Sequence, residues 1–137
     1  MYLVYIMQVG VRTDEIVDFI RKHCDVNFKL DIMRGCSYVG VCSDKCQLLG
    51  VSLIQEVSLC GDSEWIIKIM AVHRNYKDSE VERELIDEIR ENAVNKKVKL
   101  TAEISQKDSR LSQQYMTDFY ARHTIEIRNS SEISRKC

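Results

Sequence analysis

The stretch that decides the fold runs from Trp65 to Ala93 and reads WIIKIMAVHRNYKDSEVERELIDEIRENA. Its first part, as far as Val72, is an apolar run rich in β-branched residues, which predicts a buried strand. A polar turn follows, and apolar residues then recur at the spacing of one helical face at Val81, Leu85, Ile86 and Ile89. The sequence therefore predicts a strand, a short loop and a helix in direct succession.

The loop ends where the predicted helix begins. Ser79 stands at the N-cap position, and Glu82 three residues later completes a capping box. A helix N-terminus offers unpaired N–H groups and the positive end of the helix dipole, so the turn is a candidate anion site.

The same stretch resembles the acetyl-CoA-binding motif of the GCN5-related N-acetyltransferases (GNAT). In that family a strand ending x-V-x-P-x-Y-R leads into a loop Arg/Gln-x-x-Gly-x-Gly/Ala, whose backbone amides hold the pyrophosphate of the cofactor. Val72 and Tyr76 keep their places, and Lys77 stands at the Arg/Gln position. The resemblance implies that the cofactor contacts come from Met70, Ala71, Val72, Lys77, Asp78, Ser79, Glu80, Val81 and Glu82.

The phosphate-binding turn departs from the family pattern. Glu80 and Glu82 stand at the two small-residue positions, and Asp78 adds a third carboxylate. Glycine serves there because the backbone must approach the phosphates without a side chain in the way. Each like-charge contact at roughly 4 Å costs on the order of 1–4 kcal/mol, and Lys77 offsets only one of the three acids. The simpler interpretation is that Asp78, Glu80 and Glu82 are ordinary acids that stabilise the first turn of a surface helix. This interpretation argues against cofactor binding.

The composition indicates one globular domain. The chain has 137 residues, 45% hydrophobic and 30% charged, and its net charge of -1 gives no general attraction to nucleic acid or membrane. No stretch approaches the roughly 20 apolar residues of a membrane span. The apolar start, Met1–Val9, lacks the basic region and cleavage site of a signal peptide. We therefore expect an intracellular, cytoplasmic protein without nucleic-acid or membrane partners.

The six cysteines are compatible with a framework of disulfide bonds. Without a secretory signal, reduced thiols on half-buried strands are the simpler interpretation. Cys42 and Cys46 have no second pair at the spacing of a zinc site, so we expect no metal.

Patterns along the rest of the chain predict the order β-α-(α)-β-β-β-α-β-α-β, which is the order of the GNAT fold. We therefore expect a single mixed α/β domain over residues 1–128 and a polar tail over 129–137. The remaining strands are expected at Tyr2–Val9, Tyr38–Cys42, Leu48–Leu59, Val98–Ile104 and Thr124–Arg128, and helices at Thr13–His23, Phe28–Met33 and Asp108–Ala121.

Two smaller patterns refine this expectation. The hairpin before the central strand resembles a hairpin of the family, with Gly50 at its usual glycine. The last predicted helix carries Leu111, Tyr115 and Phe119 on one face and Met116 on a neighbouring face.

The resemblance also implies a catalytic acid. In the family, a tyrosine of the last helix, in the context Leu/Phe-Tyr-x-x-x-Gly-Phe, protonates the departing thiolate. Phe119-Tyr120 matches the start of this context, so Tyr120 is the candidate general acid. Thr124-Ile125 replaces the Gly-Phe pair, and the aromatic ring that would close the site is missing.

The catalytic base is less well marked. Where many members of the family place a strand glutamate, this chain has Ile66, and Glu64 lies two residues earlier on the same face. His73 and His123 could also act as bases near neutral pH, although each is more simply a surface histidine.

Two functions stay open. In the first, an acetyltransferase-like protein no longer binds acetyl-CoA productively and acts through contacts with an unidentified protein. In the second, an active N-acetyltransferase moves an acetyl group from acetyl-CoA to a primary amine, with Tyr120 as general acid. A cofactor cleft filled by side chains, with Glu80 and Glu82 directed into it, would favour the protein that acts through contacts. An open V between strands 65–72 and 98–104 would favour the active enzyme. Pairing of the later strands with a second copy would give a homodimer.

Overall fold

The computed structural model describes residues 3–8, 13–23, 36–42, 47–59, 61–76, 80–104 and 109–129. The elements in these ranges are β1 (Leu3–Gln8), α1 (Thr13–His23), β2 (Cys36–Cys42), β3 (Leu48–Leu59), β4 (Asp62–Val72), the 3₁₀ turn η2 (Arg74–Tyr76), α2 (Glu80–Lys96), β5 (Lys99–Ile104), α3 (Arg110–Arg122) and β6 (Glu126–Asn129). The predicted mixed α/β class is confirmed. The helix predicted at Phe28–Met33 lies outside the described residues.

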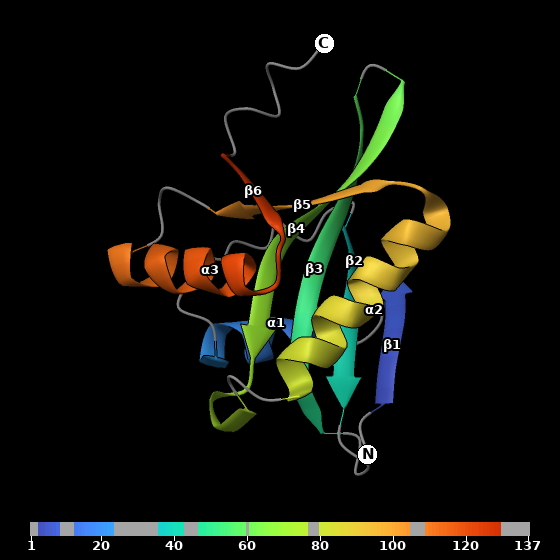
Figure 1. The fold of residues 1–137 in the computed structure, drawn as a ribbon. Coiled ribbons are helices and arrows are strands. Elements are labelled where there is room, and N and C mark those ends of the chain that lie inside the picture. Colours follow the sequence, from blue (N-terminus) through green and yellow to red (C-terminus); the bar gives the residue numbers. More distant parts are fainter. Residues whose placement is uncertain are drawn as a thin grey trace.

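The described strands form one six-stranded sheet in sequence order, from β1 to β6. β1 to β4 pair antiparallel, whereas β4, β5 and β6 pair parallel. Figure 1 shows α2 and α3 on the face of the sheet turned to the viewer, with α1 behind it. Helices therefore lie on both faces of the sheet, with the two crossover helices of the parallel strands, α2 and α3, on the same face. No helix in the described ranges is long and apolar enough to cross a membrane.

From Glu64 to Val72 the central strand β4 is buried on both faces except at Lys68, which is half-buried, as its mainly apolar run predicts. Side chains of β4 pack against α2 and α3 in the main core. α2 crosses β3 at Gly50. A Cβ at this position would stand 2.8 Å from Leu85 Cδ1, which is too close. Close packing of α2 on the sheet therefore explains the glycine of the predicted hairpin.

The end of the last helix differs from the prediction. His123 forms the C-cap of α3, and Thr124 has a positive φ of 58°, so the strand begins at Glu126 rather than at Thr124. Asn129, predicted in the tail, is the last residue of β6; the rest of the predicted tail lies outside the described residues. Leu111 is 83% exposed, because it lies in the first turn of α3, which extends past the end of β5 (Figure 1).

Candidate functional site

The predicted cofactor residues divide into three groups. Met70, Ala71 and Val72 are buried at the end of β4, and Val81 is buried in the first turn of α2. Lys77, Asp78 and Ser79 lie outside the described residues, so the capping box and the cationic position of the motif stay predictions. The remaining two residues, Glu80 and Glu82, place two carboxylates in the first turn of α2.

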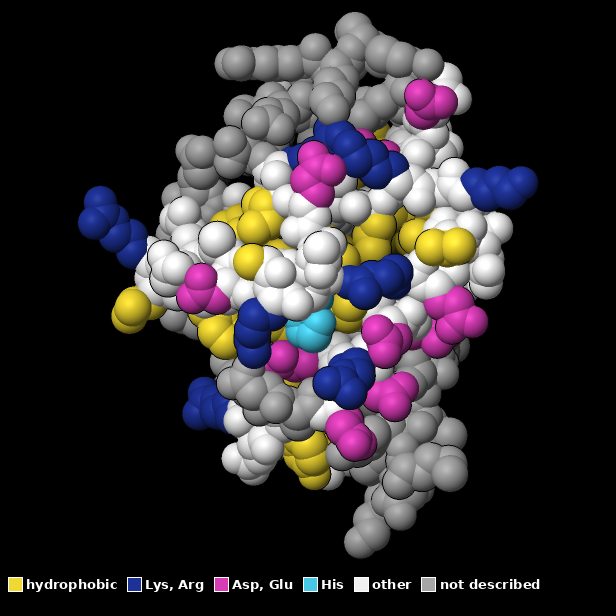
Figure 2. Space-filling model, in the orientation of Figure 1, with side chains coloured by type: hydrophobic (Ala, Val, Ile, Leu, Met, Phe, Trp, Pro, Cys, Tyr) yellow, Lys and Arg dark blue, Asp and Glu magenta, His cyan; other side chains and the backbone are white. Residues whose placement is uncertain are grey.

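Glu80 and Glu82 point in different directions. Glu80 is exposed, together with Glu84, Asp87 and Glu91, and Figure 2 shows acidic side chains gathered on this side of the molecule. Glu82 is only 2% exposed. Of the two expected acids, only Glu82 is therefore buried.

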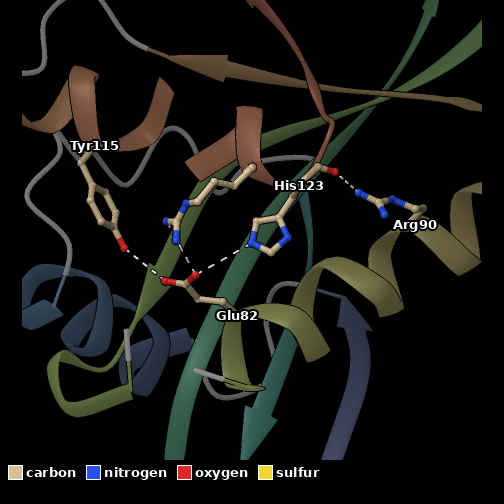
Figure 3. A network of polar contacts seen from close by, with 5 residues as sticks. Glu82, Arg90, Tyr115 and His123 are labelled. Atoms are coloured by element: carbon tan, nitrogen blue, oxygen red, sulfur yellow. Dashed lines mark hydrogen bonds and ion pairs between the residues drawn. The ribbon is translucent and has the colours of Figure 1, made fainter. Parts of the chain in front are cut away.

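The carboxylate of Glu82 lies between α2 and α3 (Figure 3). The hydroxyl of Tyr115 donates a hydrogen bond to Glu82 Oε2 over 3.3 Å. On the other oxygen, Oε1, Arg122 Nη2 stands 4.0 Å away and His123 Nε2 stands 3.9 Å away. About two turns further along α2, Arg90 donates a hydrogen bond to the backbone oxygen of His123. These contacts tie the start and middle of α2 to α3 and its C-cap.

The two strands on either side of the expected V diverge. β4 and β5 pair only from Glu64, opposite Lys99, to Ile67, opposite Ala102, and β4 then continues to Val72 without β5. At the point of divergence, Lys68 Nζ lies 2.7 Å from Glu103 Oε1. The strands therefore form a fork, and an ion pair bridges it where the backbone ladder ends.

Tyr120 lies within the core. It is 1% exposed, and its ring meets the ring of Phe119 edge-on, with 5.4 Å between centroids. Met116, Ile125 and the β4 side chains belong to the same cluster. Its role as general acid stays a prediction.

Glu64 is held in a buried polar cluster with Thr101 and Arg128. Its Oε1 accepts a hydrogen bond of 2.9 Å from Thr101 Oγ1 and lies 2.9 Å from Arg128 Nε. Both charged side chains are about nine-tenths buried or more, at 6% and 5% exposed. Three adjacent strands are therefore linked through one carboxylate, which is engaged in structure at the position predicted for a base.

The sequence reasoning missed Arg128, Lys68 and Glu103. Within the described residues, Nε and Nη1 of Arg128 and Oε2 of Glu103 form no hydrogen bond, so the Nε–H is not aligned on Glu64 although the two charges are close. The sequence did carry a signal for these residues. They are charged residues inside strands that are expected to be covered on both faces, and buried charges need partners.

Two of the three histidines form a contact that the sequence did not indicate. The rings of His23 at the end of α1 and His73 after β4 lie 4.3 Å apart. The Arg74 amide donates to His23 Nδ1 over 3.4 Å, and the Asn75 amide donates to His73 Nδ1 over 3.2 Å. These contacts fix η2 against α1. The third histidine, His123, contacts Glu82.

No protein-family model and no curated protein sequence matches this chain. Solved structures do. A GCN5-related glucosamine N-acetyltransferase region of a fungal multi-domain GH3 β-N-acetylglucosaminidase aligns with a TM-score of 0.72 and 11% identity, over 89% of this chain and 16% of that chain. The chain has the GNAT fold.

Two further neighbours are comparable to this chain in length. An aminoglycoside acetyltransferase from an uncultured soil metagenomic sample, in complex with trehalose, has a TM-score of 0.64 and 11% identity, over 88% of this chain and 86% of that chain. An aminoglycoside N-acetyltransferase in complex with CoA has a TM-score of 0.66 and 10% identity, over 92% and 88%. At such low identity these likenesses establish the fold and leave the activity to be argued from the residues.

Proposed function

We propose that this GNAT-fold protein does not bind acetyl-CoA productively and acts through contacts with another protein. The observation that carries the proposal is the buried carboxylate of Glu82. In the family motif this position holds a small residue, because the backbone must approach the pyrophosphate. A buried carboxylate adds a like charge where solvent screens little, so the residues present do not fit the anionic cofactor.

The two catalytic positions support the same proposal. The carboxylate of Glu64 forms an ion pair with Arg128 and accepts a hydrogen bond from Thr101. If this carboxylate took up a proton as a catalytic base, it would lose the ion pair. Tyr120 is enclosed by core side chains. Both groups are almost fully buried, at 1% exposed for Tyr120 and 5% for Glu64.

The fork between β4 and β5 favours the alternative, an active acetyl-CoA-dependent N-acetyltransferase with Tyr120 as general acid. Among the described strands, none pairs with the second half of β4 on the β5 side. Backbone groups on this half of β4 are then available to a ligand, as an enzyme of this fold would require.

Calorimetry with acetyl-CoA decides between the two. We expect no heat of binding with the wild-type protein and measurable binding with Glu80→Gly/Glu82→Gly, which restores the two small residues. The matched control is Glu84→Gly/Glu91→Gly, which removes two exposed acids from the same helix at the same cost in helix propensity. Binding by the wild type at micromolar strength would show that the proposal is wrong.

A second copy of the chain is the first partner to test. β6 is an edge strand, and within the described ranges it pairs only with β5. An unpaired edge is a template for another strand. Sedimentation velocity measures the mass of the species in solution, and a single species of monomer mass at high concentration would exclude the homodimer.

A further inference from the structure

The last turn of α1 meets the turn η2 through a pair of histidine rings. The centroid of the His23 ring lies 4.3 Å from that of His73 and 4.7 Å from that of Phe19. Tyr76 meets the His73 ring edge-on, with 5.5 Å between centroids. His23 is buried, and Figure 1 shows the turn after β4 close to α1. The two imidazoles therefore belong to a packed contact between elements that are far apart in the chain.

Both imidazoles accept a hydrogen bond from the backbone at the same ring atom. The Arg74 amide donates to Nδ1 of His23 over 3.4 Å, and the Asn75 amide donates to Nδ1 of His73 over 3.2 Å. A backbone N–H can only donate, so each Nδ1 carries a lone pair and each ring proton lies on Nε2. A second proton would bind to Nδ1 and turn the acceptor into a donor that faces an N–H. These hydrogen bonds therefore require both imidazoles to be neutral.

Two cationic residues belong to the same contact. Nη2 of Arg74 donates to the backbone oxygen of Lys22, in the last turn of α1, over 3.0 Å. A helix C-terminus favours a cation, and the guanidinium of Arg74 already supplies one at this carbonyl. From β3 a neutral group reaches the pair, because the oxygen of Leu49 accepts from the amide of His73 over 2.8 Å. Tyr76 presents a phenol, which is uncharged in acid. A proton taken up by either imidazole therefore adds to the positive charge of Arg74.

The acids of the two helices next to η2 offer a new imidazolium little compensation. In α1, Asp14 and Glu15 lie in the first turn, whereas η2 contacts the last turn, and Asp18 is exposed. In α2, which contacts η2, Glu80 is exposed and Glu82 contacts α3. Exposed carboxylates are screened by solvent and stabilise a nearby cation only weakly.

We propose that His23 and His73 form a pH-sensitive contact that holds η2 against α1 at neutral pH and releases it in mildly acidic solution. Histidine is the side chain that ordinarily changes its charge in this range. One proton removes the acceptor of one amide, and two protons bring like charges together across a ring contact of 4.3 Å. η2 lies between β4 and α2 in the chain, so its release changes the approach to the first turn of α2. The proposal holds whether or not the chain binds acetyl-CoA.

Acidification of the wild-type protein, followed by NMR, tests the proposal. At about pH 7.5 we expect a nuclear Overhauser effect between the ring protons of His23 and His73, and a protected amide at Arg74. At about pH 5.5 the imidazole C–H signals should report protonation, and the ring contact should be lost. The protection factor of the Arg74 amide should fall at least about fivefold. The amide of Ile67, in the central ladder, should keep its protection, which distinguishes local release from unfolding.

Asparagine variants separate titration from hydrogen bonding. The amide oxygen of asparagine accepts a hydrogen bond near the position of Nδ1 and does not titrate. In His23→Asn/His73→Asn the protection of the Arg74 amide should therefore be independent of pH. His123→Asn is the matched control, because it removes the third histidine, at the C-cap of α3, and should respond to acid as the wild type does. Should the double variant fail to fold, the single variants decide: each keeps one titrating ring and should lose less protection than the wild type.

Three results would overturn the proposal. In the first, protonation of the rings leaves the ring contact and the protection of the Arg74 amide unchanged, or neither ring takes up a proton above about pH 5. In the second, the amide of Ile67 loses its protection together with that of Arg74, because the whole domain then unfolds. In the third, His23→Asn/His73→Asn loses the protection of Arg74 in acid as the wild type does, because the loss then has another cause.

Discussion

The molecule contains two buried glutamates whose surroundings differ. Glu64, on the sheet, has partners at 2.9 Å from each of the next two strands. Glu82, between two helices, has partners at 3.3–4.0 Å. Backbone ladders fix the register of neighbouring strands, so side chains on one face meet at set distances. A groove between two helices imposes no such register. The comparison indicates that the sheet cluster serves stability, whereas the contacts of Glu82 with α3 and its C-cap are longer.

Removing the partner of Glu64 should have the largest effect. Arg128→Leu leaves a carboxylate buried without its counter-charge, which typically costs about 3–5 kcal/mol. Chemical denaturation measures this loss. The double variant Glu64→Leu/Arg128→Leu removes both charges and should recover most of the stability. A loss below about 1 kcal/mol in the single variant would mean that Glu64 is no better held than Glu82.

Removing the ion pair that bridges the fork between β4 and β5 should have the second-largest effect on stability. Lys68→Met keeps the apolar stem but leaves Glu103, whose side chain is mostly buried, without its ion pair. We expect a loss of about 1–3 kcal/mol, the cost of a buried polar group left without its partner. Lys99→Met is the matched control, because its ion pair with Glu126 is exposed and should contribute less than about 1 kcal/mol. Equal effects of the two variants would contradict the structural role of the fork bridge.

The groove contact should have a small effect on stability. Tyr115→Phe removes a long hydrogen bond to Glu82, so we expect a loss of about 0.5–1 kcal/mol in the free energy of unfolding. Thermal unfolding of this variant beside Arg128→Leu tests the comparison directly. A loss as large as that of Arg128→Leu would show that the helix groove is as tightly organised as the sheet.

The smallest effect concerns Cys36 on β2. Burial raises the pKa of the Cys36 thiol from its ordinary value of 9.0, and the nearby charge of Lys68 lowers it by less. The folded state therefore favours the neutral thiol, and its contribution to stability is present below pH 9.0 and is lost as the pH rises through the folded pKa. Unfolding between about pH 8 and 10 should be less pH-dependent in Cys36→Ala. A steeper dependence in that variant would contradict the direction of the shift.

Much of the fold followed from local patterns. The apolar run ending at Val72 and the helical spacing of Val81, Leu85 and Ile89 predicted β4 and α2, and the order of the other elements agrees with the structure wherever it is described. Glu82 could also have been assigned to the buried side, because Ile86, Ile89 and Ala93 follow it at helical spacing. A capping box instead directs the side chain of Glu82 back to the backbone N–H of Ser79.

The sequence by itself determined which segments are strands and helices, and that two acids replace small residues in the first turn of α2, because periodicity and residue type are local properties. Only the tertiary structure decided which acid is buried and what it meets. Tyr115 and His123 are more than 30 residues from Glu82 in the chain, and Arg128 is 64 residues from Glu64; α3 and β6 bring them together. Such partners depend on how helices and strands pack, and no local pattern in the chain records that packing.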